Sequence, residues 1–402
     1  MLTVRTFNIY NVLTVNTRGT YRGLVFNFQS DSPVKGILVS LKINQSGRLI
    51  GVAAKYAGLL FFCWLTVSCT AAPERLEGMP EHHTAEGFRN LHAIPTSSSK
   101  GVLFVIRRIW GSAFHPDVPD GHVLPEEVAV NSLKELEEED TLTWLGHSTF
   151  LLRINGTTIL TDPFLTNRAS PVSFVGGITR YAPPGIKIEN LPEIDMIVIS
   201  HNHYDHLDFH TIDALPNKDK IHVGVPLGVS ELFEDAGYKN IYELDWNESI
   251  TIGSIRLEAL PAVHDSGRSL VDKDKSLWAS WGIFAPSGKY YFGGDTAYSP
   301  VFKQVGDKYQ SFDMALLPIG AYGPHKLMWM SHVTPEQAIK AGQDLNADIL
   351  VAGHWGTIEL SEEDHWEPPK RFLAAAKKAG IDKEKAWVMK IGETRVLPKK
   401  NY

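Results

Sequence analysis

The sequence predicts an α/β protein, and more specifically a four-layer α/β/β/α sandwich with its functional site at one edge. Short apolar segments of strand length form two groups along the chain, and segments with helical periodicity lie between and after them. Because a sheet and an amphipathic helix must each bury an apolar face, two strand groups with helices outside them stack into four layers. Several strand-like segments end at a histidine or an aspartate, which places polar side chains along one sheet edge.

The first group of elements lies before residue 192. The acidic segment 125–140 carries apolar residues at helical spacing and predicts an amphipathic helix. Strands are expected at 141–144, 149–154 and 157–161, with Asn155-Gly156 as a two-residue hairpin turn. Residues 165–192 are rich in glycine and proline and predict a long loop of the kind that lines active sites.

Strand-like and helix-like segments alternate in the rest of the chain. Apolar runs predict strands at 196–199, 221–225, 240–244, 255–263 and 348–353. Amphipathic stretches predict helices at 211–215, 228–236, 335–345 and 369–379. These segments complete the two strand groups and supply the outer helices.

The most informative motif follows directly after the strand predicted at 196–199. It places His201, His203, Asp205 and His206 within six residues. His201 and His203 are two apart and share one face if the pleat continues, while Asp205 and His206 can face a second point nearby. Imidazole and carboxylate without thiolate are ligands that zinc accepts. The motif favours a metal site over the alternative, a solvated histidine-rich loop.

Further candidate ligands stand at the ends of later strand-like segments. His264 follows the alternating stretch 255–263, Asp295 follows Tyr-Tyr-Phe-Gly-Gly, and His354 follows the apolar run 348–353. Taken singly, each is more often a structural residue than a ligand. In this order after the first cluster, the three together indicate a metal centre built along one sheet edge.

These residues give the chain a resemblance to the metallo-β-lactamase-fold hydrolases. Several flanking stretches are similar to the group of N-acylphosphatidylethanolamine-hydrolysing phospholipases D within that superfamily. The stretches are Thr143–Ser148, Leu160–Pro163, Arg168–Pro171, Leu317–Tyr322, His332–Ala338 and His354–Thr357. The resemblance covers roughly residues 80–395 and implies the metallo-β-lactamase fold for that part of the chain.

The resemblance also implies which residues hold metal. One ion would be bound by His201, His203 and His264, the other by Asp205, His206 and His354, with Asp295 bridging the two. Two zinc ions per chain are expected, although the same ligands accept iron or manganese. The lactamases proper usually carry a cysteine where this chain has Asp295, so hydrolysis of lactam antibiotics is the less expected use.

Catalytic and substrate-binding roles are implied for a second set of residues. His332 matches a family histidine near the substrate, and Asp205 and His332 are the expected catalytic residues. Substrate contacts are expected from Tyr322, Met328, Trp329, Ser331 and His332. Animal members of the family carry a glutamine where this chain has Ser331, which leaves the head-group contact open. Met328 and Trp329 either line a groove for an acyl chain or belong to the ordinary core of a loop or short helix.

The expected chemistry is hydrolysis. Two dications that share a carboxylate lower the pKa of a bound water toward neutrality and polarise a phosphoryl or carbonyl oxygen. Asp162 either orients a ligand histidine or caps a turn, and His147 either supports the site or packs in the core. Arg168, Arg180 and Arg268 flank the motifs and either pair with phosphate or are solvated.

Three functions are compatible with these residues. The first is a metal-dependent phosphodiesterase of the phospholipase D type that acts on N-acylphosphatidylethanolamine-like phospholipids at a membrane surface. The second is a metal-dependent lactonase or another ester hydrolase. The third is a non-catalytic envelope protein, which the complete set of seven candidate ligands disfavours. A net charge of −7 with no basic cluster argues against nucleic acid as a partner.

At 402 residues and 43% hydrophobic composition, the chain is long enough for one catalytic domain, expected at 80–402, after an extension at 1–79. Its two cysteines, Cys63 and Cys69, both lie in the extension, which excludes a disulfide framework and a thiolate metal site in the catalytic body. The segment 48–69 combines basic residues with a short apolar core and predicts a signal peptide with a lipoprotein-like site at Cys69. The alternatives are an uncleaved anchor or a buried helix. A bacterial cell envelope location is expected, with the cytoplasm as the alternative.

Overall fold

The computed structural model describes residues 10–16, 19–25, 78–91, 116–171, 177–269 and 271–398. The chain forms two compact units, Met1–Ala72 and Pro73–Tyr402. In the first unit, β1 (Tyr10–Asn16) pairs antiparallel with β2 (Gly19–Val25). The segment 48–69 predicted to target the chain to the envelope lies outside the described residues. Within the described ranges, every helix is too short or too polar to cross a membrane.

The second unit contains two seven-stranded sheets. The first has the order β12 (Asn240–Leu244), β11 (His222–Pro226), β10 (Met196–Val198), β7 (Thr157–Thr161), β6 (Thr149–Ile154), β5 (Thr141–Gly146) and β20 (Thr394–Val396). The second has the order β13 (Ser249–Ile252), β14 (Ile255–Leu260), β15 (Ser280–Ala285), β16 (Gly288–Phe292), β17 (Phe312–Pro318), β18 (Ala347–Gly353) and β19 (Ala386–Trp387). Two small hairpins pair β3 (His83–Thr84) with β4 (Gly87–Phe88) and β8 (Arg168–Ala169) with β9 (Ile178–Thr179).

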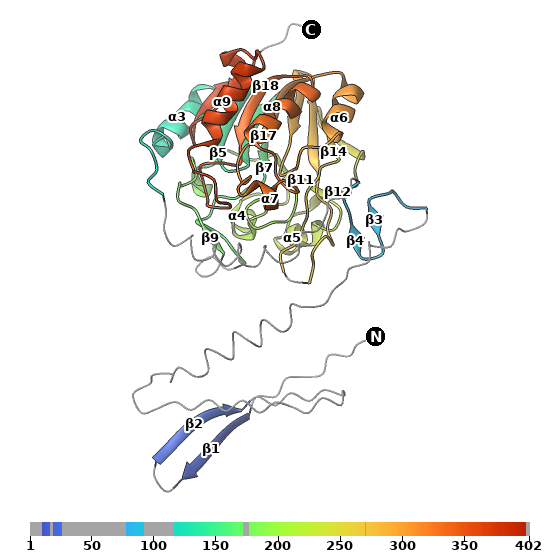
Figure 1. The fold of residues 1–402 in the computed structure, drawn as a ribbon. Helices are drawn as coiled ribbons and strands as arrows, with labels where there is room; N and C mark the ends of the chain where they lie inside the picture. Colours follow the sequence, from blue (N-terminus) through green and yellow to red (C-terminus); the bar gives the residue numbers. More distant parts are fainter. Residues whose placement is uncertain are drawn as a thin grey trace. The chain divides into compact units, whose positions relative to one another are not determined.

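Helices cover the outer faces of the two sheets (Figure 1). The first sheet is covered by α3 (Glu126–Glu135), α4 (Phe209–Ala214) and α5 (Ser230–Asp235), and the second by α6 (Val301–Tyr309), α8 (Pro335–Asp344) and α9 (Pro368–Lys378). A short helix, α7 (His325–Met328), lies in the connection between β17 and α8. The 3-10 helices η1 (Ile188–Asn190) and η2 (Lys383–Lys385) occupy further connections.

The burial of β10 shows how the four layers are stacked. Met196 and Val198 belong to a core cluster that contains residues of both sheets, such as Trp281. Ile197 lies on the opposite face and belongs to a second cluster that includes Phe233 of α5. A strand buried on both faces has a continuous apolar sequence rather than an alternating one, as this run does. The predicted α/β/β/α sandwich is confirmed.

The expected elements correspond closely to the observed ones. The helix predicted at 335–345 is α8, which begins with a capping box between Thr334 and Gln337 and has Pro335 at its first turn. The segment 165–192, expected as a loop, also contains β8, β9 and η1. A bridge between Arg180 and Ile358 ties this segment to the chain after β18.

Strand direction brings the polar segments together. In the first sheet, β7 and β10 are parallel, and in the second β16, β17 and β18 are parallel. The carboxyl ends of β10, β16 and β18 lead into His201, Asp295 and His354, respectively. Parallel strands end at the same edge of a sheet, so each sheet delivers its candidate ligands at one edge.

Candidate metal centre

The first group of candidate ligands consists of three imidazoles. His203 Nδ1 lies 2.8 Å from His201 Nε2 and 3.4 Å from His264 Nε2. His201 and His203 come from the loop after β10 in the first sheet, and His264 follows β14 in the second. All three ligand atoms lie within 4.8 Å of one another, which places them at a distance that one ion can span.

The second group combines a carboxylate with two imidazoles. Asp205 Oδ2 lies 3.4 Å from His206 Nε2 and 3.8 Å from His354 Nε2. His206 and His354 are fully buried. His147, whose role was left open between support and packing, joins this group because its Nε2 lies 2.9 Å from the same oxygen of Asp205.

Asp295 connects the two groups. Its Oδ1 lies 3.1 Å from His354 Nε2, and its Oδ2 lies 3.2 Å from His206 Nε2 and 3.8 Å from His264 Nε2. The turn before it depends on Gly294, which has a φ of 56° and where a Cβ would lie 2.3 Å from the Cβ of Ser200. The structure thus brings all seven predicted side chains together, with one carboxylate between the two sets.

Burial and charge set the protonation of these groups. Burial lowers the pKa of His203 to about 4 and that of His201 well below its ordinary value, so both imidazoles are neutral, the form that binds metal. Burial opposes ionisation of Asp295, but His206 and His354 hold its pKa well below its usual range. Burial also opposes ionisation of Asp205, but His206 and His147 hold its pKa well below the usual range.

Neighbouring groups orient the candidate ligands. Asp162 Oδ2 lies 2.6 Å from His206 Nδ1 and also accepts the Ser200 hydroxyl, so the orienting role of Asp162 is the one that the geometry supports. His264 Nδ1 lies 3.0 Å from the carbonyl oxygen of Ser331. With these partners on the far ring nitrogens, His206 and His264 present Nε2 to the centre.

The ligand set fits divalent metal ions. His206 Nε2, His354 Nε2 and Asp295 Oδ1 are buried, and although they lie in ion-pair contact, none of them forms a hydrogen bond of suitable angle within the described part of the chain. A buried polar atom without a partner is costly, and these three face one another. Imidazole and carboxylate donors in two sets around a shared carboxylate suit zinc, and they also accept iron or manganese.

Of the residues predicted to contact substrate, His332 lies beside the candidate ligands. His332 is buried, and its Nδ1 lies 3.8 Å from Asp295 Oδ2. Its backbone N–H donates to the carbonyl of Met328, which ties it to α7. Met328 is half-buried, and Trp329 is 42% exposed. Tyr322 is buried and donates its hydroxyl to Glu367 at 2.8 Å.

The three arginines near the motifs differ in their surroundings. Arg268 donates to the carbonyls of Asn202 and Leu207 at 2.8 and 2.7 Å, which braces the loop that carries the first ligands. Arg180 is buried and donates to the carbonyls of Phe164 and Ala182. Both guanidinium groups therefore bind backbone, whereas Arg168 lies half-buried in β8.

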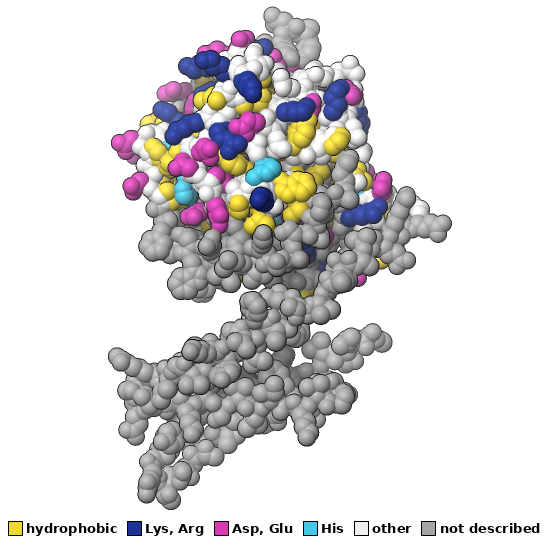
Figure 2. All heavy atoms as spheres, in the orientation of Figure 1, with side chains coloured by type: hydrophobic (Ala, Val, Ile, Leu, Met, Phe, Trp, Pro, Cys, Tyr) yellow, Lys and Arg dark blue, Asp and Glu magenta, His cyan; other side chains and the backbone are white. Residues whose placement is uncertain are grey.

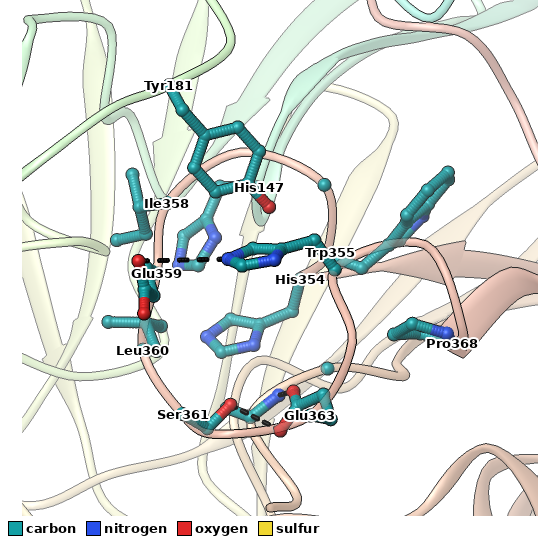
Figure 3. A pocket seen from close by; sticks show the side chains of 14 residues that line it. His147, Tyr181, His354, Trp355, Ile358, Glu359, Leu360, Ser361, Glu363 and Pro368 are labelled. Atoms are coloured by element: carbon teal, nitrogen blue, oxygen red, sulfur yellow. Dashed lines mark hydrogen bonds and ion pairs between the residues drawn. The ribbon is translucent and has the colours of Figure 1, made fainter. Parts of the chain in front are cut away.

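A small cavity lies beside the second ligand group. It has a volume of about 30 Å³, and Figure 3 shows His147 and His354 at its wall beneath the ring of Tyr181. Glu359 and His365, which form an ion pair of 3.7 Å, also line this cavity. A cavity of this size suits ordered water and is far too small for an acyl chain.

Comparison with known proteins agrees with this geometry. Residues 157–355 match the β-lactamase superfamily domain. The chain is 34% identical over 289 residues to N-acyl-phosphatidylethanolamine-hydrolyzing phospholipase D 1 of Caenorhabditis elegans, covering 68% of this chain and 81% of that protein. It is 43% identical over 241 residues to an uncharacterised protein of Mycobacterium tuberculosis, covering 58% of this chain and 63% of that protein's length.

A solved structure supports the fold. The isothiocyanate hydrolase from Delia radicum gut bacteria superposes with a TM-score of 0.52 at 19% identity, covering 65% of this chain and all of that chain. At this identity the likeness concerns the fold alone. Together with the domain match and the nematode relative, it establishes that the chain belongs to the metallo-β-lactamase superfamily of metal-dependent hydrolases, in the family of the N-acylphosphatidylethanolamine-hydrolysing phospholipases D.

Proposed function

We propose that this protein is a phosphodiesterase of the phospholipase D type that uses two zinc ions. The proposed substrate is an N-acylphosphatidylethanolamine-like phospholipid, whose phosphodiester bond water would cleave to give phosphatidic acid and the N-acylethanolamine alcohol. The observation that carries the proposal is the position of Asp295, whose two oxygens face the two ligand groups. The named activity of the nematode relative, 34% identical over most of its length, supports the choice of substrate class.

The metal pair would supply the nucleophile, by lowering the pKa of a bound water, and would polarise the phosphoryl oxygens. The chain's own residues would hold and orient the reactants. Asp205 and Asp295 would place negative charge between the imidazoles, and Asp162 would fix the ring of His206. Burial lowers the pKa of His332 to about 3. His332 is therefore neutral and would donate one N–H to a phosphate oxygen or to the leaving group.

The lipid part of the substrate would lie along α7. Trp329 is exposed beside half-buried Met328, and the carbonyl of Met328 is bonded to the backbone of His332. Figure 2 shows hydrophobic side chains together with a histidine and a basic side chain where Figure 1 draws α7. Apolar side chains beside a basic one suit a phospholipid surface with its anionic head groups. A location at the membrane of a bacterial cell envelope is proposed from this surface together with the segment 48–69, and nucleic acid is not a proposed partner because the net charge is −7.

The test compares an intact lipid with a lactone panel. Purified protein loaded with zinc is expected to release phosphatidic acid from N-acylphosphatidylethanolamine, with two metal ions per chain by elemental analysis. Asp295→Asn removes the carboxylate shared by both groups, so turnover is expected to fall by at least a hundredfold while the protein remains folded. A matched exchange far from the site, Asp348→Asn at the start of β18, is expected to keep full turnover.

Three results would contradict the proposal. Hydrolysis of lactones without any release of phosphatidic acid would replace the phosphodiesterase by the lactonase. Undiminished lipid turnover in Asp295→Asn would show that the two ligand groups are not the catalytic centre. Metal content below one ion per chain after zinc loading would contradict the two-ion site.

A further inference from the structure

We infer that Asn90 is a positioning residue of the metal centre, which holds the backbone of the ligand His264 from a hairpin near the start of the catalytic unit. The two residues are 174 positions apart in the sequence. The hairpin also precedes residues 157–355, which match the superfamily domain. The inference rests on the proposed metal centre and adds to it a segment outside that domain.

The side-chain amide of Asn90 binds both backbone groups of His264. Asn90 Nδ2 donates to the carbonyl oxygen of His264 at 2.7 Å, and Asn90 Oδ1 accepts the N–H of His264 at 3.2 Å. The indole N–H of Trp278 donates to the same Oδ1 at 3.2 Å. The amide thus offers a donor and an acceptor on the same planar group, in the pattern that a neighbouring strand would present. A carboxylate of the same shape has no donor for the carbonyl of His264.

The ring of His264 is fixed independently of its backbone. Its Nδ1 lies 3.0 Å from the carbonyl of Ser331 in the connection after α7. Backbone and ring are therefore held from two directions, and Nε2 is left to face His203 at 3.4 Å. A ligand held in this way loses little conformational freedom when a metal binds, because its orientation is already set.

The hairpin that carries Asn90 is anchored at points away from the centre. His82 Nε2 and His83 Nε2 lie 2.5 and 2.7 Å from the two separate oxygens of Asp245. The N–H of Phe88 donates to the carbonyl of Asp274 at 2.8 Å. At Gly87 a Cβ would lie 2.1 Å from that same carbonyl oxygen, so only glycine permits this approach. These contacts at Asp245 and Asp274 hold the hairpin that precedes Asn90 in place.

The contact at Asp245 holds the hairpin to the segment that follows β12. Each of its oxygens already has its own imidazole at hydrogen-bond distance. The ring of His82 also stacks on Trp246, with centroids 4.2 Å apart. This anchor can therefore be loosened without touching His264, which makes it a control for the effect of Asn90.

The experiment replaces the amide of Asn90 by a carboxylate and, in a second variant, the carboxylate of Asp245 by an amide. Asn90→Asp keeps the shape and the acceptor but removes the donor to the carbonyl of His264. Asp245→Asn weakens the hairpin anchor and leaves Asn90 intact. For both variants and the wild type, zinc affinity is measured by competition with a chelator, the visible spectrum is recorded with cobalt(II) in place of zinc, and the thermal unfolding midpoint of the zinc-loaded protein is determined.

The Asn90 variants are expected to lose zinc affinity, whereas the Asp245 variant is expected to lose only thermal stability. Asn90→Asp is expected to weaken binding of one zinc ion by roughly ten- to a hundredfold and to change the cobalt spectrum. Asp245→Asn is expected to lower the unfolding midpoint while both zinc ions bind as in the wild type. Asn90→Ala, which removes donor and acceptor together, is expected to weaken the same ion at least as much as Asn90→Asp.

Three results would overturn the inference. The first is wild-type zinc affinity in both Asn90 variants. The second is an equal loss of affinity in Asp245→Asn, because Asn90 would then act only through the stability of the hairpin. The third is a wild-type protein that binds no zinc, which removes the centre itself. Loss of lipid turnover alone does not bear on Asn90, so a failure of the proposed function and a failure of this inference remain distinguishable.

Discussion

At the residue scale, Asp205 Oδ2 shows how closely the centre is packed. This oxygen lies 2.9 Å from His147 Nε2 and within 3.8 Å of Nε2 on both His206 and His354. His147 itself is held by its backbone, since its carbonyl accepts the N–H of His354 at 2.9 Å. With a φ of 55°, His147 occupies the left-handed region that a side chain disfavours. Such strain is kept where the surroundings fix it, which points to a positioning role for His147.

Replacing His147 tests this role. His147→Ala leaves Asp205 Oδ2 without its imidazole donor, so the affinity for the metal ion of the second group is expected to fall by roughly ten- to a hundredfold. His147→Gln offers an amide N–H in place of the imidazole and is expected to lose less. Chelator competition monitored by elemental analysis measures both. Unchanged metal retention in His147→Ala would show that the residue only packs in the core.

The candidate ligands can be found from the sequence, whereas the residues that orient them cannot. His264 and His354 stand at the ends of apolar runs, so strand periodicity and side-chain chemistry together point to them. The partners that orient them leave no such signal. Asn90 binds the backbone of His264, which lies 174 positions later in the sequence. Ser331 binds the ring of His264 through its backbone carbonyl oxygen, a group that every residue has. Long-range hydrogen bonds of this kind depend on the folded topology and not on local pattern.

At the element scale, strands with continuous apolar sequences were predictable and short connecting elements were not. The strands expected at 149–154 and 157–161 match β6 and β7 at both ends. The long loop expected at 165–192 contains β8 and β9, whose two-residue strands are too short to produce a periodic signal. The sequence left open whether Met328 and Trp329 line a groove or belong to the core. The helix α7 has only four residues, which are too few to define an amphipathic face.

The surface of α7 leads to a prediction about lipid binding. Replacing Trp329 and Met328 with glutamine removes exposed and half-buried apolar groups next to His332, so the Michaelis constant for lipid vesicles is expected to rise roughly tenfold, equivalent to about 1.4 kcal/mol. Turnover of a soluble phosphodiester is expected to stay within twofold, because that substrate has no acyl chains to bury. Steady-state kinetics on both substrates measures the difference.

Leu373 of α9 provides the matched control for this prediction. It is 41% exposed, close to the 42% of Trp329, but it lies on the helix layer outside the second sheet. Leu373→Gln is expected to leave both Michaelis constants unchanged. An equal loss on the lipid and on the soluble substrate in the α7 variant would instead indicate that Trp329 and Met328 stabilise the position of His332.

At the scale of the whole molecule, the candidate ligands connect the two sheets. His201, His203, Asp205 and His206 come from the first sheet, whereas His264, Asp295 and His354 come from the second. The four-layer arrangement followed from the alternation of apolar and amphipathic segments, and strand-like segments that end at candidate ligands predicted a site along one sheet edge. The structure adds that the ligands come from two different sheets. A metal pair in this position would cross-link the sheets at their common edge.

Removal of metal is therefore expected to destabilise the catalytic unit as a whole. An ion that binds only the folded state and is present at a hundred times its dissociation constant stabilises that state by about 2.7 kcal/mol. Treatment with a chelator is expected to lower the thermal unfolding midpoint, and two equivalents of zinc per chain are expected to restore it. Asp295→Asn, which lacks the shared carboxylate, serves as the control and is expected to respond much less to chelator. Identical unfolding of wild-type protein with and without zinc would contradict a metal link between the two sheets.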